Sequence, residues 1–243
     1  MTGKEYLALD KFRKNFRQKI IEWNSAVSNL KELQIQAAKE AKTPDYSFET
    51  PIVYNKALDE ITKEDDIKII FIGDNPGKDE QLLKNNKYLV GQAGKLGEGF
   101  FKKNPELNID FRKNAIILNK TPVHSAKTNQ LKNIIKNGGK KTEELLTETQ
   151  IWMAKNTAEL AKELNAEIWL IGYSELKEKG IFITYRDELL KNADYNKLFV
   201  YQHFSMNRFS IDLKAFQNQN PQLSLKDALI QLGNLHKEEI FMH

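Results

Sequence analysis

Four polar side chains come directly after short apolar runs in this 243-residue chain, and their types could do chemistry together. In chain order they are Asp74 and Asn75, then Asn119, then His203. A carboxylate can take up a proton, an amide both donates and accepts hydrogen bonds, and an imidazole can donate one. If the apolar runs are parallel strands, their carboxyl ends share one rim of the sheet, where open α/β sheets bind ligands. The sequence therefore predicts one pocket lined by a carboxylate, two amides and an imidazole.

Four apolar runs predict the strands that would position these side chains, at 67–72, 115–118, 168–171 and 198–201. Each run lacks the polar alternation of a half-exposed strand, which indicates burial on both faces, as in a parallel sheet. The sequence between the runs is mostly helical in pattern. We therefore expect an α/β fold of the three-layer α/β/α type, with a central four-stranded parallel sheet and an N-terminal helical extension.

The chain divides into two predicted parts, a helical extension over 1–50, packed on or beside the core, and an α/β/α domain over 51–243. Apolar side chains of the first forty residues recur at helical spacing, so their aromatics are expected to be core contacts rather than base-stacking groups. Pro44 ends this pattern. Other expected elements are a connector to Tyr54, a short helix at 55–66, a surface turn at 132–141, and helices at 143–164, 208–217 and 225–235, the last capped by Ser224.

The composition excludes several kinds of chemistry. The chain has no cysteine, which excludes disulfides, thiolate catalysis and cysteine-held metal or iron–sulfur centres, and its four histidines form no His-x-x-x-His pair. We therefore expect no metal and no cofactor. A net charge of +4 permits nucleic-acid binding without indicating it, since inert surfaces carry the same excess. No apolar run is long enough to span a membrane and no signal peptide begins the chain, which predicts a cytoplasmic protein without a membrane partner.

Two segments and two strand ends together resemble the uracil-DNA glycosylase superfamily. The segments are GDNPGKDEQ at 73–81 and YLVGQAGKLG at 88–97, and the strand ends are Asn119 and the His-Phe-Ser run at 203–205. The first segment is similar to the Gly-x-Asn-Pro-Gly motif of the mismatch-specific and single-strand-selective branches. It carries an acid where the iron–sulfur branch has Glu, and the second segment is similar to that branch's Val-Gly-Arg-Ala-Gly. The resemblance covers about residues 67–210 and excludes the N-terminal helices.

The resemblance implies removal of uracil, or a related deaminated base, from DNA after the nucleotide has been flipped out of the stack. It assigns Asp74 and Asn75 to holding the water, and we favour Asp74 as the base because an Asn cannot take up a proton near neutral pH. It assigns His203 as the hydrogen-bond donor to the departing base. Gly73 and Asn119 would contact the base, and Asn119 would read its Watson–Crick edge.

The remaining implied contacts are to DNA or to the face of the base. Gly77, Lys78, Lys120, Ser205, Asn207 and Arg208 are the expected DNA-binding residues. Leu89 lies where many relatives have a stacking Phe, and Tyr88 precedes it, so either Tyr88 stacks on the base or the pocket is less selective. Phe204 replaces the Pro of the family's His-Pro-Ser or His-Pro-Ala motif, and we expect this change to alter the loop of Met206, Asn207 and Arg208 that would enter the duplex. The cluster-binding cysteines of the iron–sulfur branch are absent.

Three functions are compatible with these observations. The first is a monofunctional glycosylase, because the water mechanism needs no Schiff base and no pocket lysine stands out as a nucleophile. The second is a protein with the same fold and pocket that binds nucleic acid or a nucleobase without cleavage. The third is a Rossmann-like nucleotide-binding enzyme, which is disfavoured because the first motif lacks both Gly-x-Gly-x-x-Gly and the Walker Lys.

Overall fold

A parallel four-stranded sheet lies at the centre of the protein, whose residues 1–242 are described by a computed structural model. The strands are β1 (Ile69–Gly73), β2 (Ala115–Asn119), β3 (Glu167–Ile171) and β4 (Leu198–Tyr201), arranged in the order β2-β1-β3-β4. Every neighbouring pair is parallel, so all four carboxyl ends lie on one rim. The four-stranded parallel sheet expected from the apolar runs is confirmed. His243, the last residue of the predicted domain, lies outside the described residues.

The strands separate two hydrophobic cores. Ile70 and Ile72 of β1 pack in one core, while Ile69 and Phe71 pack in the other. Successive side chains of a strand point to opposite faces, so a strand covered on both faces must be apolar at every position. This explains why the four runs show no polar alternation.

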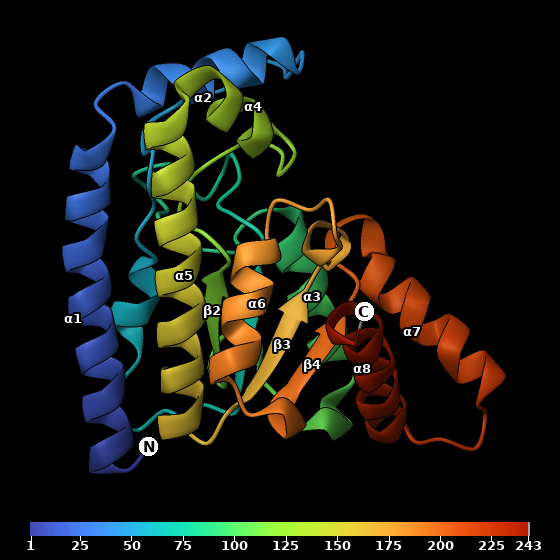
Figure 1. The fold of residues 1–243 in the computed structure, drawn as a ribbon. Coiled ribbons are helices and arrows are strands. Elements are labelled where there is room, and N and C mark those ends of the chain that lie inside the picture. Colours follow the sequence, from blue (N-terminus) through green and yellow to red (C-terminus); the bar gives the residue numbers. More distant parts are fainter. Residues whose placement is uncertain (243) are drawn as a thin grey trace.

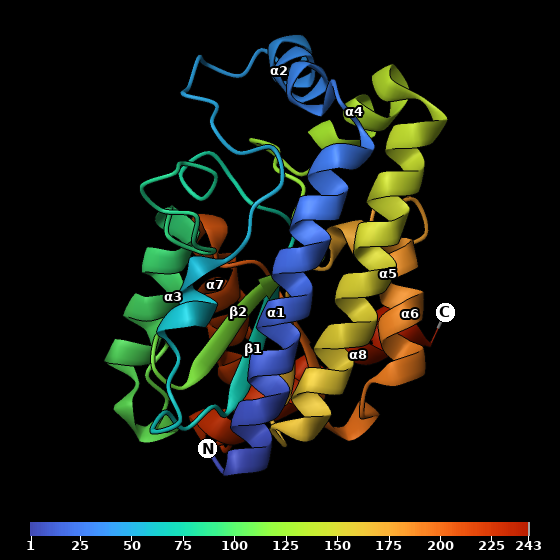
Figure 2. The same cartoon turned by 90° about the vertical axis from the view of Figure 1, so that its left-hand side faces the viewer.

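Helices cover both faces of the sheet, as Figures 1 and 2 show. One face carries α1 (Gly3–Ala26), α5 (Lys140–Glu163) and α6 (Ile183–Asn192), and the other carries α3 (Gln92–Lys103), α7 (Arg208–Gln219) and α8 (Leu225–Phe241). The pair α2 (Leu30–Glu40) and α4 (Gln130–Gly138) packs together near the carboxyl rim of the strands (Figure 1). Short 3-10 helices at Lys56–Glu60, Pro105–Leu107, Ser174–Leu176, Tyr195–Lys197 and Ser205–Asn207 lie in the connections. The three-layer α/β/α architecture is thus confirmed.

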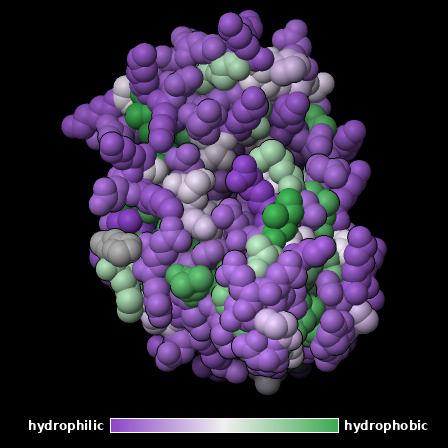
Figure 3. All heavy atoms as spheres, turned by 90° about the vertical axis from the view of Figure 1, so that its right-hand side faces the viewer, coloured by the Kyte–Doolittle hydropathy of each residue, from purple (hydrophilic) through white to green (hydrophobic). Residues whose placement is uncertain are grey.

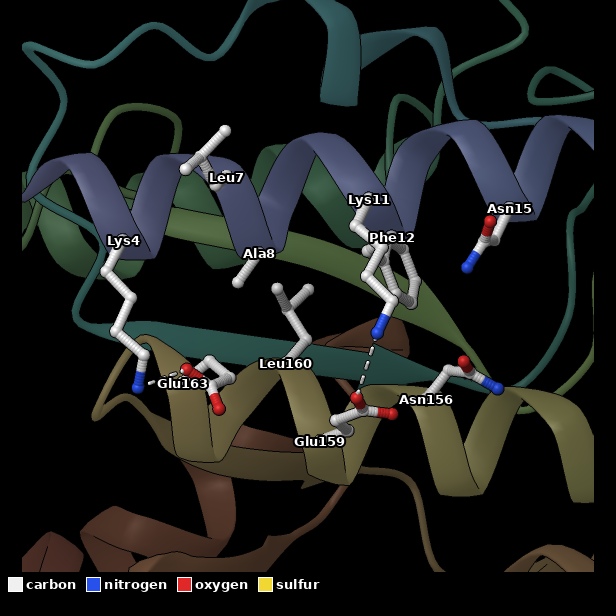
Figure 4. A pocket seen from close by; sticks show the side chains of 10 residues that line it. All are labelled: Lys4, Leu7, Ala8, Lys11, Phe12, Asn15, Asn156, Glu159, Leu160 and Glu163. Carbon is white, nitrogen blue, oxygen red and sulfur yellow. Dashed lines mark ion pairs between the residues drawn. The ribbon is translucent and has the colours of Figure 1, made fainter.

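The N-terminal helix is part of the main core. Phe16 is fully buried and stacks on Trp152 of α5 at 5.4 Å between ring centroids. A groove of about 260 Å³ lies between the first half of α1 and the last part of α5, and ion pairs from Lys4 to Glu163 and from Lys11 to Glu159 cross it (Figure 4). The aromatic side chains of α1 are core contacts, as expected.

One predicted connection is wrong and one helix was not predicted. Residues 132–141 are not a surface turn, because α4 ends at Gly138 and α5 begins at Lys140. Leu131 and Ile134 lie one helical turn apart and are both fully buried, which makes this segment an amphipathic helix. The two glycines end that helix, with Gly139 at a φ of +65°. The helix α6, with buried Tyr185 and Leu189, was not predicted.

The short helix expected at 55–66 is only a 3-10 helix, Lys56–Glu60, but the other helical expectations agree with the structure within a few residues at most ends. The helices expected at 143–164 and 208–217 are α5 and α7, and α8 extends to Phe241, beyond the expected end at 235. Ser224 caps α8 by accepting a hydrogen bond from the Asp227 amide, as predicted. Within residues 1–242, no helix combines the length and apolarity that a membrane span requires.

Candidate functional site

A cavity of about 570 Å³ lies at the carboxyl rim of the sheet, within the size range of small-molecule sites. The structure brings together most of the residues expected there. Those that line the cavity are Gly73, Asp74, Asn75, Gly77, Leu89, Asn119, His203, Ser205 and Arg208. The four polar strand-end side chains therefore share one pocket.

Asp74 and Asn75 present different groups to this cavity. Asp74 Oδ1 accepts a hydrogen bond from Lys120 Nζ at 2.5 Å, and Asp74 Oδ2 accepts one from the Thr128 hydroxyl at 3.3 Å. The Asn75 amide nitrogen donates to the carbonyl and the hydroxyl oxygen of Ser125, at 3.1 and 2.9 Å. Because protein groups take up this nitrogen, the amide oxygen is the atom that Asn75 can offer to a ligand.

Asn119 is almost fully buried, yet its amide nitrogen has no hydrogen-bond partner among the described residues. A buried donor without a partner carries a desolvation cost, which a ligand acceptor would remove. The amide lies against Gly73, where an added Cβ atom would come within 2.6 Å of Asn119 Oδ1. Gly73 is thus required at the end of β1 because the Asn119 side chain occupies the space beside it.

The hydrogen bonds of His203 define the state of its ring. The backbone amide of Ser205 donates to His203 Nδ1 at 3.0 Å, so this nitrogen carries no proton. Burial lowers the pKa of His203, although the nearby Asp74 opposes the shift. The ring is therefore neutral at neutral pH, with its proton on Nε2. Within residues 1–242, Nε2 makes no hydrogen bond and is available as a donor.

A buried carboxylate holds the loop that forms one wall of the cavity. Glu80 accepts hydrogen bonds from the Gly77 amide at 2.9 Å and from the Leu89 amide at 2.7 Å. Its burial raises its pKa to about 7, against the effect of these two hydrogen bonds. Leu89 has a φ of +51° and its carbonyl accepts from Arg112 at 2.7 Å. Gly94 is required here, because a Cβ atom would overlap the Leu89 carbonyl.

Two expected site residues have a different place in the structure. Lys120 is not a surface contact for phosphate, because its side chain is fully buried and its ammonium contacts Asp74 and the Gly172 carbonyl. Tyr88 does not supply a stacking face to the cavity. Its ring is buried in the core on the α3 side, and its hydroxyl donates to the Val53 carbonyl at 2.6 Å. Leu89, which lines the cavity, is the nearer apolar group.

The expected DNA-contacting loop lies at the mouth of the cavity. Met206 is 71% exposed and lines the cavity together with Arg208. Met206 and Asn207 both have positive φ angles, 54° and 56°, so this turn holds two successive residues in the left-handed region. Lys78 and Asn207 are exposed but do not line the cavity, and their contact with DNA stays a prediction. Figure 3 shows the side of the molecule that is on the right in Figure 1, where hydrophilic residues predominate and apolar residues form several small groups.

Several cavity residues were not predicted. They include Glu80, Gln92, Ser125, Lys127, Thr128, Gly172, Tyr173 and Gln202. Glu80 lies in the segment GDNPGKDEQ at 73–81, but an acidic residue in such a segment does not indicate burial. Gly172 directly follows β3 on the same rim as the other strand ends, and this position could have been inferred from the parallel order. The loop from Ser125 to Thr128 carries no motif that points to the cavity.

Comparisons with protein families, curated proteins and solved structures found no match. Among the described residues there is also no cluster of three or more His, Asp or Glu side chains arranged to hold a metal ion.

Proposed function

We propose that this protein is a monofunctional DNA glycosylase that hydrolyses the N-glycosidic bond of uracil, or of a related deaminated base, flipped out of DNA. The observation that supports the proposal best is the convergence in one cavity of a carboxylate, two amides and a neutral imidazole. These are the groups that such a hydrolysis requires, because a water must be held beside the sugar while negative charge develops on the departing base.

Asp74 and Asn75 would hold the water. Asp74 is the only one of the two that can take up a proton, and its Oδ2 atom has the long Thr128 contact as its protein partner. Asn75 offers an acceptor oxygen, since its nitrogen is bound to Ser125. We therefore assign Asp74 as the general base and Asn75 as a second acceptor for the same water.

His203 would stabilise the departing base as a neutral donor. A neutral imidazole with its proton on Nε2 can donate to an oxygen that gains negative charge, and it does not need to lose a proton first. Removing one such donor from an enzyme costs about 2.7–4 kcal/mol of transition-state stabilisation.

Asn119 would select the base. Its unpartnered amide nitrogen needs an acceptor, such as the carbonyl oxygen that replaces an amino group when a base is deaminated. The exposed Met206 and the cation of Arg208, both beside the cavity, would contact the duplex around the flipped nucleotide.

The test is a single-turnover assay on labelled oligonucleotides with one uracil, single-stranded or opposite guanine, in which alkali cleaves the abasic product. We expect the wild type to form abasic sites. We expect Asp74→Ala and Asn75→Ala to lose most of this rate, and His203→Ala to slow it about 10²- to 10³-fold. Asn114→Ala is the control, because Asn114 bonds Asp66 and Asp110 outside the cavity.

The outcomes separate the alternatives. Cleavage that survives all three substitutions would place the chemistry elsewhere in the molecule. A wild type that binds these oligonucleotides without cleaving them would show a binding protein, and one that neither binds nor cleaves would exclude both functions.

A further inference from the structure

Lys120 has a fully buried side chain in a position that requires explanation. It directly follows Asn119 at the end of β2, and its side chain has no exposed surface. A buried ammonium is costly unless it is paired and hydrogen-bonded. Lys120 is thus a charged group inside the protein, next to the candidate site but not among the residues that line the cavity.

The contacts of Lys120 join three neighbouring strand ends. Its ammonium donates to Asp74 Oδ1 at 2.5 Å, after β1, and to the Gly172 carbonyl at 2.9 Å, after β3. On another side, the ammonium lies 5.5 Å from the centre of the Phe182 ring. Asp74 is the one carboxylate with which Lys120 forms an ion pair in residues 1–242. The position of Asp74 is therefore tied to that of Lys120.

The same contact also places Asp74 relative to His203. Gly172 has a φ of +88°, and a Cβ atom there would lie 3.1 Å from His203 Cδ2 and 3.5 Å from Asp74 Oδ1. Gly172, which follows β3, is thus close to both the carboxylate and the imidazole, and the Lys120 ammonium donates to the Gly172 carbonyl. With Oδ1 bound to Lys120, Oδ2 is the oxygen of Asp74 that remains for a water.

We propose that Lys120 is a positioning residue of the candidate site, which acts through Asp74 by fixing the carboxylate with one oxygen toward the cavity. This inference rests on the proposed function for its catalytic consequence. A buried ion pair that served the fold alone could be replaced by apolar groups without loss of activity.

The test is a double-mutant cycle with Lys120→Met, Asp74→Asn and the double variant, measured by single-turnover rate and by urea unfolding. If Lys120 acts through Asp74, we expect Lys120→Met to slow base release about 100-fold in the wild type, the size of effect that a misplaced catalytic group produces. In the Asp74→Asn background we expect the same substitution to change the rate less than about 3-fold.

Lys237→Met is the matched control. Lys237 is also buried, bonds the Tyr195 carbonyl and lies over aromatic rings, but it forms no ion pair in the described residues and lies outside the cavity. We expect Lys237→Met to lower the urea midpoint and to leave the rate within about 2-fold of the wild type. A comparable loss of rate in Lys237→Met would show that burial, and not the Asp74 contact, causes the effect, and would overturn the proposal.

Unfolding keeps the inference separate from the proposed function. If Lys120 fixes Asp74, each single substitution leaves the other member of the ion pair buried without its partner. The summed decreases in urea midpoint of the two single variants should then exceed the decrease of the double variant. Additive midpoints would overturn the proposal. A wild type without glycosylase activity, but with coupled midpoints, would refute the function and leave the Lys120–Asp74 unit in place.

Discussion

At the scale of single residues, polar side chains of the candidate site lie close to glycines that follow or end the strands. Gly73 lies against the Asn119 amide, and Gly172 lies close to both His203 and Asp74. The amide nitrogen of Asn119 has no hydrogen-bond partner in residues 1–242, so no hydrogen bond from this nitrogen fixes the amide beside Gly73. The orientation of this amide is therefore sensitive to any atom added at position 73.

We predict that Gly73→Ala slows base release at least about 10-fold, because the new Cβ atom would lie 2.6 Å from Asn119 Oδ1 and push the amide aside. The single-turnover assay measures this effect. Gly99→Ala is the control, since a Cβ atom there meets nothing within 4 Å. It should keep the wild-type rate and gain about 0.5–1 kcal/mol of stability from the improved helix propensity. Equal rates for Gly73→Ala and the wild type would contradict the role given to Asn119.

At the scale of elements, the loop between β1 and α3 forms a wall of the cavity, and one buried acid links two distant points of it. Glu80 accepts hydrogen bonds from the backbone amides of Gly77 and Leu89. A carboxylate can accept through both oxygens, whereas a protonated carboxyl carries a hydroxyl on one of them. Protonation of Glu80 should therefore weaken one of these two hydrogen bonds, but it also removes the larger desolvation cost of a buried charge.

We predict a pH-dependent difference in stability between the wild type and Glu80→Gln. The folded pKa of Glu80 is about 7, above its ordinary value of 4.5, so the folded state binds the proton more tightly. Proton binding by Glu80 therefore stabilises the folded state, by about 3 kcal/mol. This stabilisation is complete below about pH 4.5 and is lost as the pH rises through 7. Urea unfolding of both proteins from pH 4.5 to 8 measures the difference, and parallel pH profiles would contradict the shift.

The elements were more predictable from the sequence than the contacts between them. A strand that is buried on both faces is apolar along its whole length, and such a run is easy to recognise in a sequence. All four strands agree with their predictions within two residues at each end. Helix α4 was missed because its paired glycines are also typical of turns. The burial of Lys120 could not be predicted, since a lysine after a strand is ordinarily exposed and only the tertiary structure brings Asp74 to it. The same holds for Tyr88, whose partner Val53 is distant in sequence.

At the scale of the whole molecule, the extension predicted at 1–50 is continuous with the domain core. Five apolar side chains of α1 are buried, and Trp152 of α5 contacts three of the aromatic rings of that helix. This arrangement places α1 in the outer layer on the α5 side of the sheet (Figure 2). Removal of α1 would thus expose the core on that side.

We predict that Phe16→Ala lowers the free energy of unfolding by about 3–5 kcal/mol, because it removes a fully buried ring from the core shared by α1 and α5. Leu7→Ala, at a side chain that is 68% exposed on the same helix, should change it by less than about 0.5 kcal/mol. Chemical denaturation measures both. A small effect of Phe16→Ala would indicate an extension that is dispensable for the fold.

The pairing of α1 with α5 also has a consequence for synthesis on the ribosome. The last residue of α5, Glu163, follows the last residue of α1, Ala26, by 137 residues, so at 5–20 residues per second α1 is made roughly 7–27 s before its partner is complete. During that interval its apolar stripe has no place to be buried. Chaperone binding to nascent chains should therefore begin early on this protein and end once α5 has left the exit tunnel.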